Sequence, residues 1–115
     1  MIDPLFHQVY HRQNYNCVHL LIDAWQMVTG EDLSARMSGV MVAVSQGHGL
    51  QWGDVRHFER LPKPISPCIA LMTGKQSPHV GLFYNRKILH ITEEGVQYMP
   101  PEIATIGFDR VRYYR

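Results

Sequence analysis

The sequence predicts an α+β fold, in which N-terminal helices pack on an antiparallel sheet of about five strands. Apolar residues recur at helical spacing in the first half of the chain, and short apolar or alternating runs follow in the second half. Between the halves, residues 61–67 contain three prolines, which exclude a helix or a central strand and favour an extended crossing. We expect one domain over residues 1–115.

Two helices are expected at the start of the chain. The first is predicted over residues 3–13, with an apolar side formed by Phe6, Val9 and Tyr10. The second is predicted to begin at Cys17 and to end at Gly30, because Asn16 is a suitable N-cap and glycine favours the C-terminal end. Its apolar stripe comprises Val18, Leu21, Ile22, Trp25 and Val28.

A third helix is expected after a cap supplied by Asp32 or Ser34. Residues 46–53 hold three glycines and are predicted to end this helix in a loop, with Trp52 and Phe58 as packing anchors. The buried stripe of the third helix is predicted to comprise Leu33, Met37, Val40, Met41 and Val44.

The second half is expected to form a meander of antiparallel strands. A tight two-residue turn is predicted at Asn85 and Arg86, and a short helical turn at residues 100–102. The strands are predicted over residues 68–72, 79–84, 87–92, 96–99 and 108–114.

Cys17 is a candidate nucleophile because of its place at a helix N-terminus. That position favours negative charge, so we expect its thiol to have a lowered pKa. The chain starts without a basic segment or an apolar signal core, which predicts synthesis in the cytoplasm. We therefore expect Cys17 and Cys68 to be free thiols instead of a disulfide.

Two histidines are candidate partners of Cys17. A two-residue turn at Asn85 and Arg86 would place His79 and His90 as diagonal neighbours on one face of the hairpin. A thiol nucleophile needs a base within hydrogen-bond reach, and the base needs a third group that fixes its orientation. We expect Cys17 to act as nucleophile, His79 as base and His90 as orienting group, as in a papain-like site.

At these residues the chain resembles the NlpC-type cysteine endopeptidases, papain-like cell-wall hydrolases of bacteria and their phages. The block from His79 to Tyr84 reads His-Val-Gly-Leu-Phe-Tyr, close to the His-Val-Gly-Ile-Tyr strand of that family, and Ile88-Leu89-His90 matches its second strand. The chain departs from the family at the nucleophile helix. Asn16 stands where the family has Asp, and Val18 and His19 stand where it has Ser and Gly.

The resemblance implies hydrolysis of amide bonds in peptidoglycan stem peptides by Cys17, His79 and His90. It also implies that Tyr15 lies near the nucleophile, and Asn16 and Val18 complete the expected substrate and oxyanion vicinity. The small size and the C-terminal sequence are similar to members encoded among phage tail genes. This implies a location at the virion tail tip and contacts with tail-tip proteins.

Two other interpretations remain open. In one, the fold serves as a catalytically idle structural component of a phage tail tip. In the other, Cys17, His79 and His90 hold zinc. No cofactor or metal is expected in the favoured interpretation. The formal net charge of +1 predicts no nucleic-acid partner, and the lack of an apolar stretch of about 20 residues predicts no membrane insertion.

Overall fold

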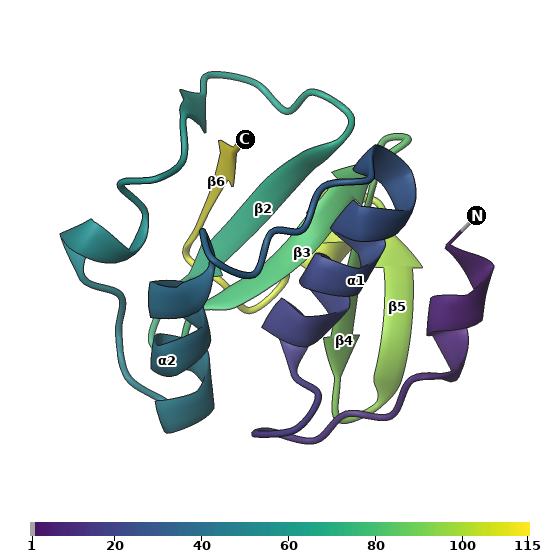
Figure 1. Cartoon of the computed structure of the whole chain (residues 1–115), viewed down its shortest axis with the longest axis horizontal. Coiled ribbons are helices and arrows are strands. Elements are labelled where there is room, and N and C mark those ends of the chain that lie inside the picture. The colour runs from purple at the N-terminus through teal and green to yellow at the C-terminus, as the bar shows by residue number, and fades with distance from the viewer. Residues whose placement is uncertain (1) are drawn as a thin grey trace.

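A six-stranded antiparallel sheet forms the centre of the protein (Figure 1). Its strands are β1 (Arg60–Leu61), β2 (Cys68–Thr73), β3 (His79–Tyr84), β4 (Lys87–Thr92), β5 (Gly95–Met99) and β6 (Arg110–Tyr114). Helix α1 (Cys17–Thr29) packs on one face, over β3 and β4. The predicted α+β class is therefore confirmed. The computed structural model describes residues 2–115 apart from the Trp52 side chain, so the packing role expected for Trp52 lies outside the described residues.

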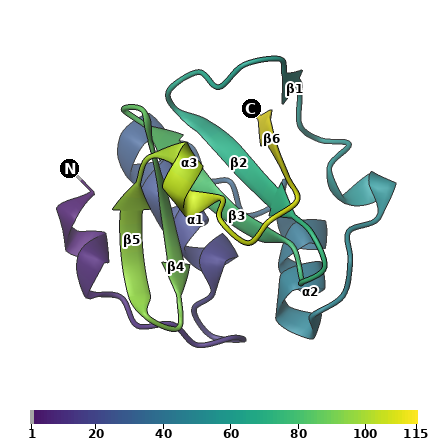
Figure 2. The same cartoon turned by 180° about the vertical axis from the view of Figure 1, so that it is seen from behind.

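The strand order differs from the predicted simple meander. Strands β2 to β5 are neighbours in sequence order, but β6 pairs with β2 instead of β5, and the two-residue β1 pairs with β6. The short helix α3 (Pro101–Ala104) lies on the face of the sheet opposite α1 (Figure 2). The chain crosses this face because a second apolar surface there needs a cover. Ala104 and Phe108 of the crossing pack on it, beside Val111 and Tyr113 of β6.

The sheet is buried on both faces at β2. Ile69 and Leu71 belong to the core under α1, whereas Cys68, Ala70 and Met72 belong to the smaller core under the α3 crossing. A strand with two buried faces requires a continuous apolar run, which is what the sequence has at these positions.

The predicted first helix is wrong beyond its first turns. Only a 3-10 helix, η1 (Asp3–His7), forms, and the chain then runs on without regular structure to a single bridge between His11 and Tyr15. Ile2 and Leu5, three residues apart, are buried, whereas Val9 is 78% exposed. A longer helix would have no apolar face to pack.

The third helix starts later than predicted. Helix α2 covers Ser38–Gln46, and residues 34–37 form turns in front of it. Asp32 accepts hydrogen bonds from the backbone N–H and the hydroxyl of Ser34, at 2.9 and 2.6 Å, which favours a local turn over a helix start. Leu33 and Met37 are nevertheless buried, as the predicted stripe required.

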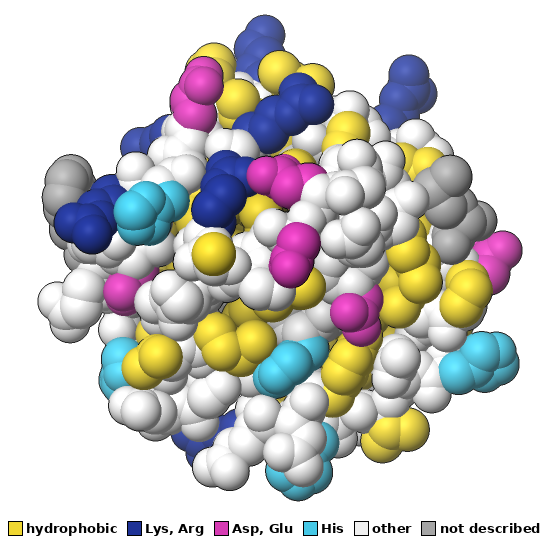
Figure 3. Space-filling model, in the orientation of Figure 1, with side chains coloured by type: hydrophobic (Ala, Val, Ile, Leu, Met, Phe, Trp, Pro, Cys, Tyr) yellow, Lys and Arg dark blue, Asp and Glu magenta, His cyan; other side chains and the backbone are white. Residues whose placement is uncertain are grey.

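The described surface carries charges of both signs. Figure 3 shows Lys and Arg side chains next to Asp and Glu side chains on the face that carries α1 and α2. Over residues 2–115, no helix has both the length and the apolar character that crossing a membrane requires.

Candidate active site

Asn16 organises the N-terminus of α1. Its side-chain oxygen accepts a hydrogen bond from the Val18 N–H, and its own N–H donates to His19 Nδ1, both at 2.9 Å. These two bonds form a capping box. The side-chain nitrogen of Asn16, Nδ2, also donates to the Arg12 carbonyl at 2.8 Å and to Ser45 Oγ at 3.2 Å. The buried Asn16 thus ties the first turn of α1 to the preceding loop and to α2.

The two donor bonds of the side-chain nitrogen require an amide at position 16. We expect Asn16→Asp to lower the free energy of unfolding by about 3 kcal/mol, because a buried carboxylate would face the Arg12 carbonyl without a proton to donate. Urea unfolding measures this loss. Asn14→Asp, the same change at an exposed position of the same loop, is the control, and equal stability of the two variants would contradict the prediction.

The β3–β4 hairpin places the two histidines on one face. Tyr84 pairs with Lys87 across a turn made of Asn85 and Arg86, whose φ angles are 49° and 70°. Positive φ at both central residues is typical of the tight turn that suits strand twist. The predicted two-residue turn is confirmed, and the pairing runs from Tyr84 and Lys87 to Leu82 and Leu89. Gly81, the next residue, lies close to His90, whose Cβ would be 3.3 Å from a Cβ added at Gly81.

His79 and His90 are in direct contact. His79 Nε2 and His90 Nδ1 are 2.8 Å apart in a hydrogen bond, and the rings meet edge to face at 81°. Phe108 stacks on the other side of His79, with ring centroids 5.7 Å apart and planes 10° from parallel. A hydrogen bond and a stacked ring therefore hold the His79 imidazole in one orientation.

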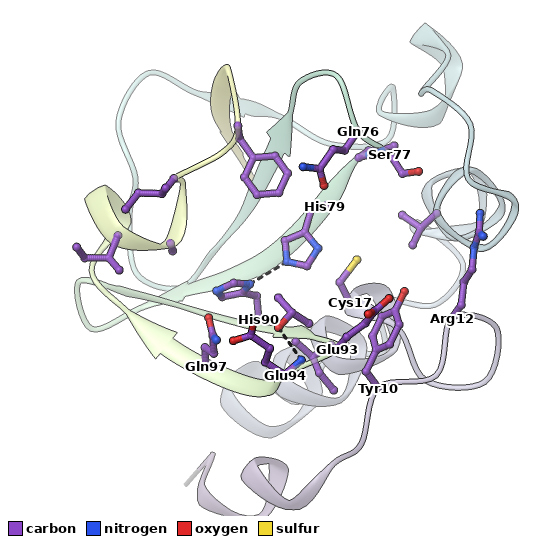
Figure 4. A pocket seen from close by; sticks show the side chains of 18 residues that line it. Tyr10, Arg12, Cys17, Gln76, Ser77, His79, His90, Glu93, Glu94 and Gln97 are labelled. Carbon is purple, nitrogen blue, oxygen red and sulfur yellow. Dashed lines mark hydrogen bonds between the residues drawn. The ribbon is translucent and has the colours of Figure 1, made fainter.

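Cys17, His79 and His90 line one cavity of about 620 Å³ (Figure 4). Cys17 enters from the end of α1, and the His79 ring nitrogen that is not bonded to His90 lies on the Cys17 side. The sulfur interacts with the backbone amides of Val80, Cys17 and Val18. The cavity thus brings together the three side chains that the sequence singled out.

The thiol differs from the expectation of a lowered pKa. Burial raises the pKa of Cys17 to about 11, although the nearby backbone amides lower it, because only 3% of the residue is exposed. The position at a helix N-terminus does not compensate for the loss of water. At neutral pH the resting site therefore holds a protonated thiol.

The imidazoles are also neutral in the resting site. Burial, and secondarily the neighbouring His90, lowers the pKa of His79 from 6.5 to about 3, and burial lowers the pKa of His90. One neutral ring must donate and the other must accept in the bond between them. The pair is therefore suited to hold a free imidazole lone pair at neutral pH.

The depressed pKa of His79 predicts acid destabilisation. Between pH 6.5 and about 3 the unfolded chain binds a proton at His79 that the folded chain does not. The free energy of unfolding should therefore fall as the pH falls through this window, by up to about 1.4 kcal/mol per pH unit from this group. Urea unfolding at several pH values measures the slope. His79→Gln should reduce it.

His7→Gln removes an exposed imidazole and is the control for the acid experiment. A slope that His79→Gln leaves unchanged would contradict the assignment of the acid sensitivity to His79.

The side chains of Tyr15, Asn16 and Val18, expected around the nucleophile, do not line the Cys17 cavity. Tyr15 lines a separate cavity between α1 and α2, and its hydroxyl donates to Asp23 at 2.7 Å. The side chains of Asn16 and Val18 are fully buried and do not line the Cys17 cavity. They contribute through the structure of the helix end, not through contact with a molecule in the cavity.

The cavity is also lined by residues that the sequence did not identify. Tyr10 lies on the Cys17 side (Figure 4), and the pKa of its hydroxyl is raised by burial and then by Cys17. Glu93, Glu94 and Gln97 line the cavity from the β4–β5 hairpin. Gln97 could have been predicted, because the hairpin register places it opposite His90. Tyr10 could not, because it lies on an irregular segment whose sequence shows no periodicity.

The zinc interpretation finds no support in the geometry. His79 Nε2 and His90 Nδ1 face one another instead of converging on a common point. Within residues 2–115, no three side chains of the His, Cys, Asp and Glu types are grouped so that they could hold a metal ion.

No protein-family model, curated protein or solved structure matches this chain.

Proposed function

We propose that this chain is a papain-like cysteine peptidase of the NlpC type that hydrolyses amide bonds in peptidoglycan stem peptides. The observation that supports it is the meeting of Cys17 with the hydrogen-bonded pair of His79 and His90 in one cavity. The identity of the substrate rests on the resemblance of the His79 strand and the His90 strand to that family. A place at a phage tail tip rests instead on the similarity of the C-terminal sequence to members encoded among phage tail genes.

The first half of the proposed reaction acylates the enzyme. His79 Nδ1 takes the proton from the Cys17 thiol while the sulfur bonds to the substrate carbonyl carbon. The backbone N–H of Cys17, at the first position of α1, is one of the helix amides without an intrahelical partner and donates to the oxyanion. The carbon–nitrogen bond then breaks, and His79 returns the proton to the leaving amine.

The second half releases the acid. Water attacks the thioester while His79 takes a proton from it, the carbon–sulfur bond breaks, and the sulfur regains the proton from His79. Since Cys17 and His79 are both neutral at rest, the proton moves during the attack instead of before it. Hydrogen bonds between base and nucleophile commonly tighten only when substrate is bound.

A structural role at a phage tail tip is the alternative, and one observation favours it. The Cys17 sulfur is buried and its pKa is raised, which are properties of an inert thiol. The fold would then retain the three residues without using them.

Digestion of purified peptidoglycan under reducing conditions distinguishes the two functions. The peptidase should release soluble fragments whose new amino and carboxyl groups, identified by mass spectrometry, mark one bond of the stem peptide. Peptidoglycans with stem peptides of several compositions should be tested. Intact peptidoglycan in every case, with a folded protein, would overturn the peptidase proposal in favour of the structural role.

A further inference from the structure

One buried nitrogen of the histidine pair has no hydrogen-bond partner among the described residues. His90 is 4% exposed, and its Nε2 is buried without a hydrogen bond among the described residues, while its Nδ1 bonds to His79. A buried polar atom left unsatisfied costs about 1–3 kcal/mol. Because buried polar atoms are nearly always hydrogen-bonded, we expect a hydrogen-bond acceptor close to this nitrogen.

Gln97 is the side chain best placed to supply that partner. It stands directly opposite His90 in the β4–β5 register, so the two side chains share one face of the sheet. It is partly exposed and lines the same cavity, and Figure 4 shows it beside the His90 ring. Rotation about the side-chain bonds of Gln97 can turn its amide oxygen toward His90 Nε2.

We propose that Gln97 is a positioning residue whose Oε1 accepts a hydrogen bond from the Nε2–H of His90. The proposal deepens the proposed function and rests on it for its catalytic meaning. Gln97 acts through His90 and His79 and does not touch the substrate carbonyl.

The reason lies in the two ways a neutral histidine pair can share protons. In one, His90 carries its proton on Nε2, His79 Nε2–H donates to His90 Nδ1, and His79 Nδ1 is a free base. In the other, His90 Nδ1–H donates to His79 Nε2, and His79 Nδ1 carries a proton and cannot take one from a thiol. An acceptor at His90 Nε2 selects the first arrangement.

Nitrogen-15 NMR of the histidine rings tests this without substrate. In the unmodified protein we expect His79 and His90 both to be protonated on Nε2. In Gln97→Met, which removes the acceptor at similar size, both rings should shift toward protonation on Nδ1. Glu94→Gln, on the same hairpin and the same cavity, is the control and should leave the protonation pattern unchanged.

Gln97→Glu keeps an acceptor and should restore the Nε2-protonated pattern that Gln97→Met loses. His90 protonated on Nδ1 in the unmodified protein would overturn the proposal. So would a pattern that Gln97→Met leaves unchanged, or one that responds to Glu94→Gln instead.

The catalytic consequence is measured separately. Gln97→Met should lower kcat for stem-peptide cleavage by about tenfold with little change in KM. This loss is smaller than the whole contribution of general acid–base catalysis, because His79 remains in place. Gln97→Glu should recover most of the lost kcat. If the NMR result holds but peptidoglycan stays intact, the proposed function fails and the assignment of Gln97 stands.

Discussion

Replacement of Cys17 by alanine is expected to abolish release of stem-peptide fragments from peptidoglycan, by at least about a thousandfold in kcat. Without the sulfur no acyl-enzyme forms, and the groups that remain give only slow background hydrolysis. Fragment release, followed by mass spectrometry under reducing conditions, measures the loss. Cys17→Ser, which keeps the size and the polar atom, should be almost as inactive.

Cys68→Ala is the matched control for this experiment. Cys68 is equally buried, but it lies in the core on the opposite face of the sheet from α1 and does not line the cavity. Its loss should lower stability by about 1 kcal/mol and leave fragment release intact. Release that survives Cys17→Ala in a protein with an unchanged circular dichroism spectrum would remove Cys17 from the mechanism.

Gly81→Ala is expected to destabilise the fold and to disrupt the histidine pair as well. An added Cβ would lie 2.6 Å from Ile88 Cγ2, 2.8 Å from the Leu89 carbonyl oxygen and 3.3 Å from His90 Cβ. The backbone oxygen cannot yield as a side chain can, so β3 and β4 must separate. We expect a loss of about 1–3 kcal/mol from overpacking, together with a large fall in any peptidase activity.

Gly49→Ala is the control, because nothing lies within 4 Å of a Cβ at that exposed glycine. Urea unfolding of both variants measures the difference. Wild-type stability and an unchanged NMR pattern of the histidine rings in Gly81→Ala would show that the close approach of β4 is not required.

The predictions that succeeded concern features built from neighbours in sequence. Asn16 caps α1, Gly30 ends it in the left-handed conformation, and the turn at Asn85 and Arg86 has two residues. A two-residue turn determines the register of its hairpin, so the contact of His79 with His90 was predictable. Each of these features depends on local backbone geometry and the period of the side chains.

The features that failed or were missed depend on contacts distant in sequence. The pairing of β6 with β2, the stacking of Phe108 on His79 and the presence of Tyr10 in the cavity have no local signal. The first helix failed for a related reason: helix length depends on whether a neighbouring surface can bury its apolar side.

The sequence alone determined the α+β class, the helix that starts at Cys17 and the pairing of two histidines on one hairpin. Only the tertiary structure decided that Cys17 shares a cavity with that pair, and that its thiol and His79 are both neutral at rest. The physical reason is that hydrogen bonds between neighbours in sequence specify turns and helix ends. Burial, which determines the cavity and the protonation state of its groups, is a property of the whole packed chain.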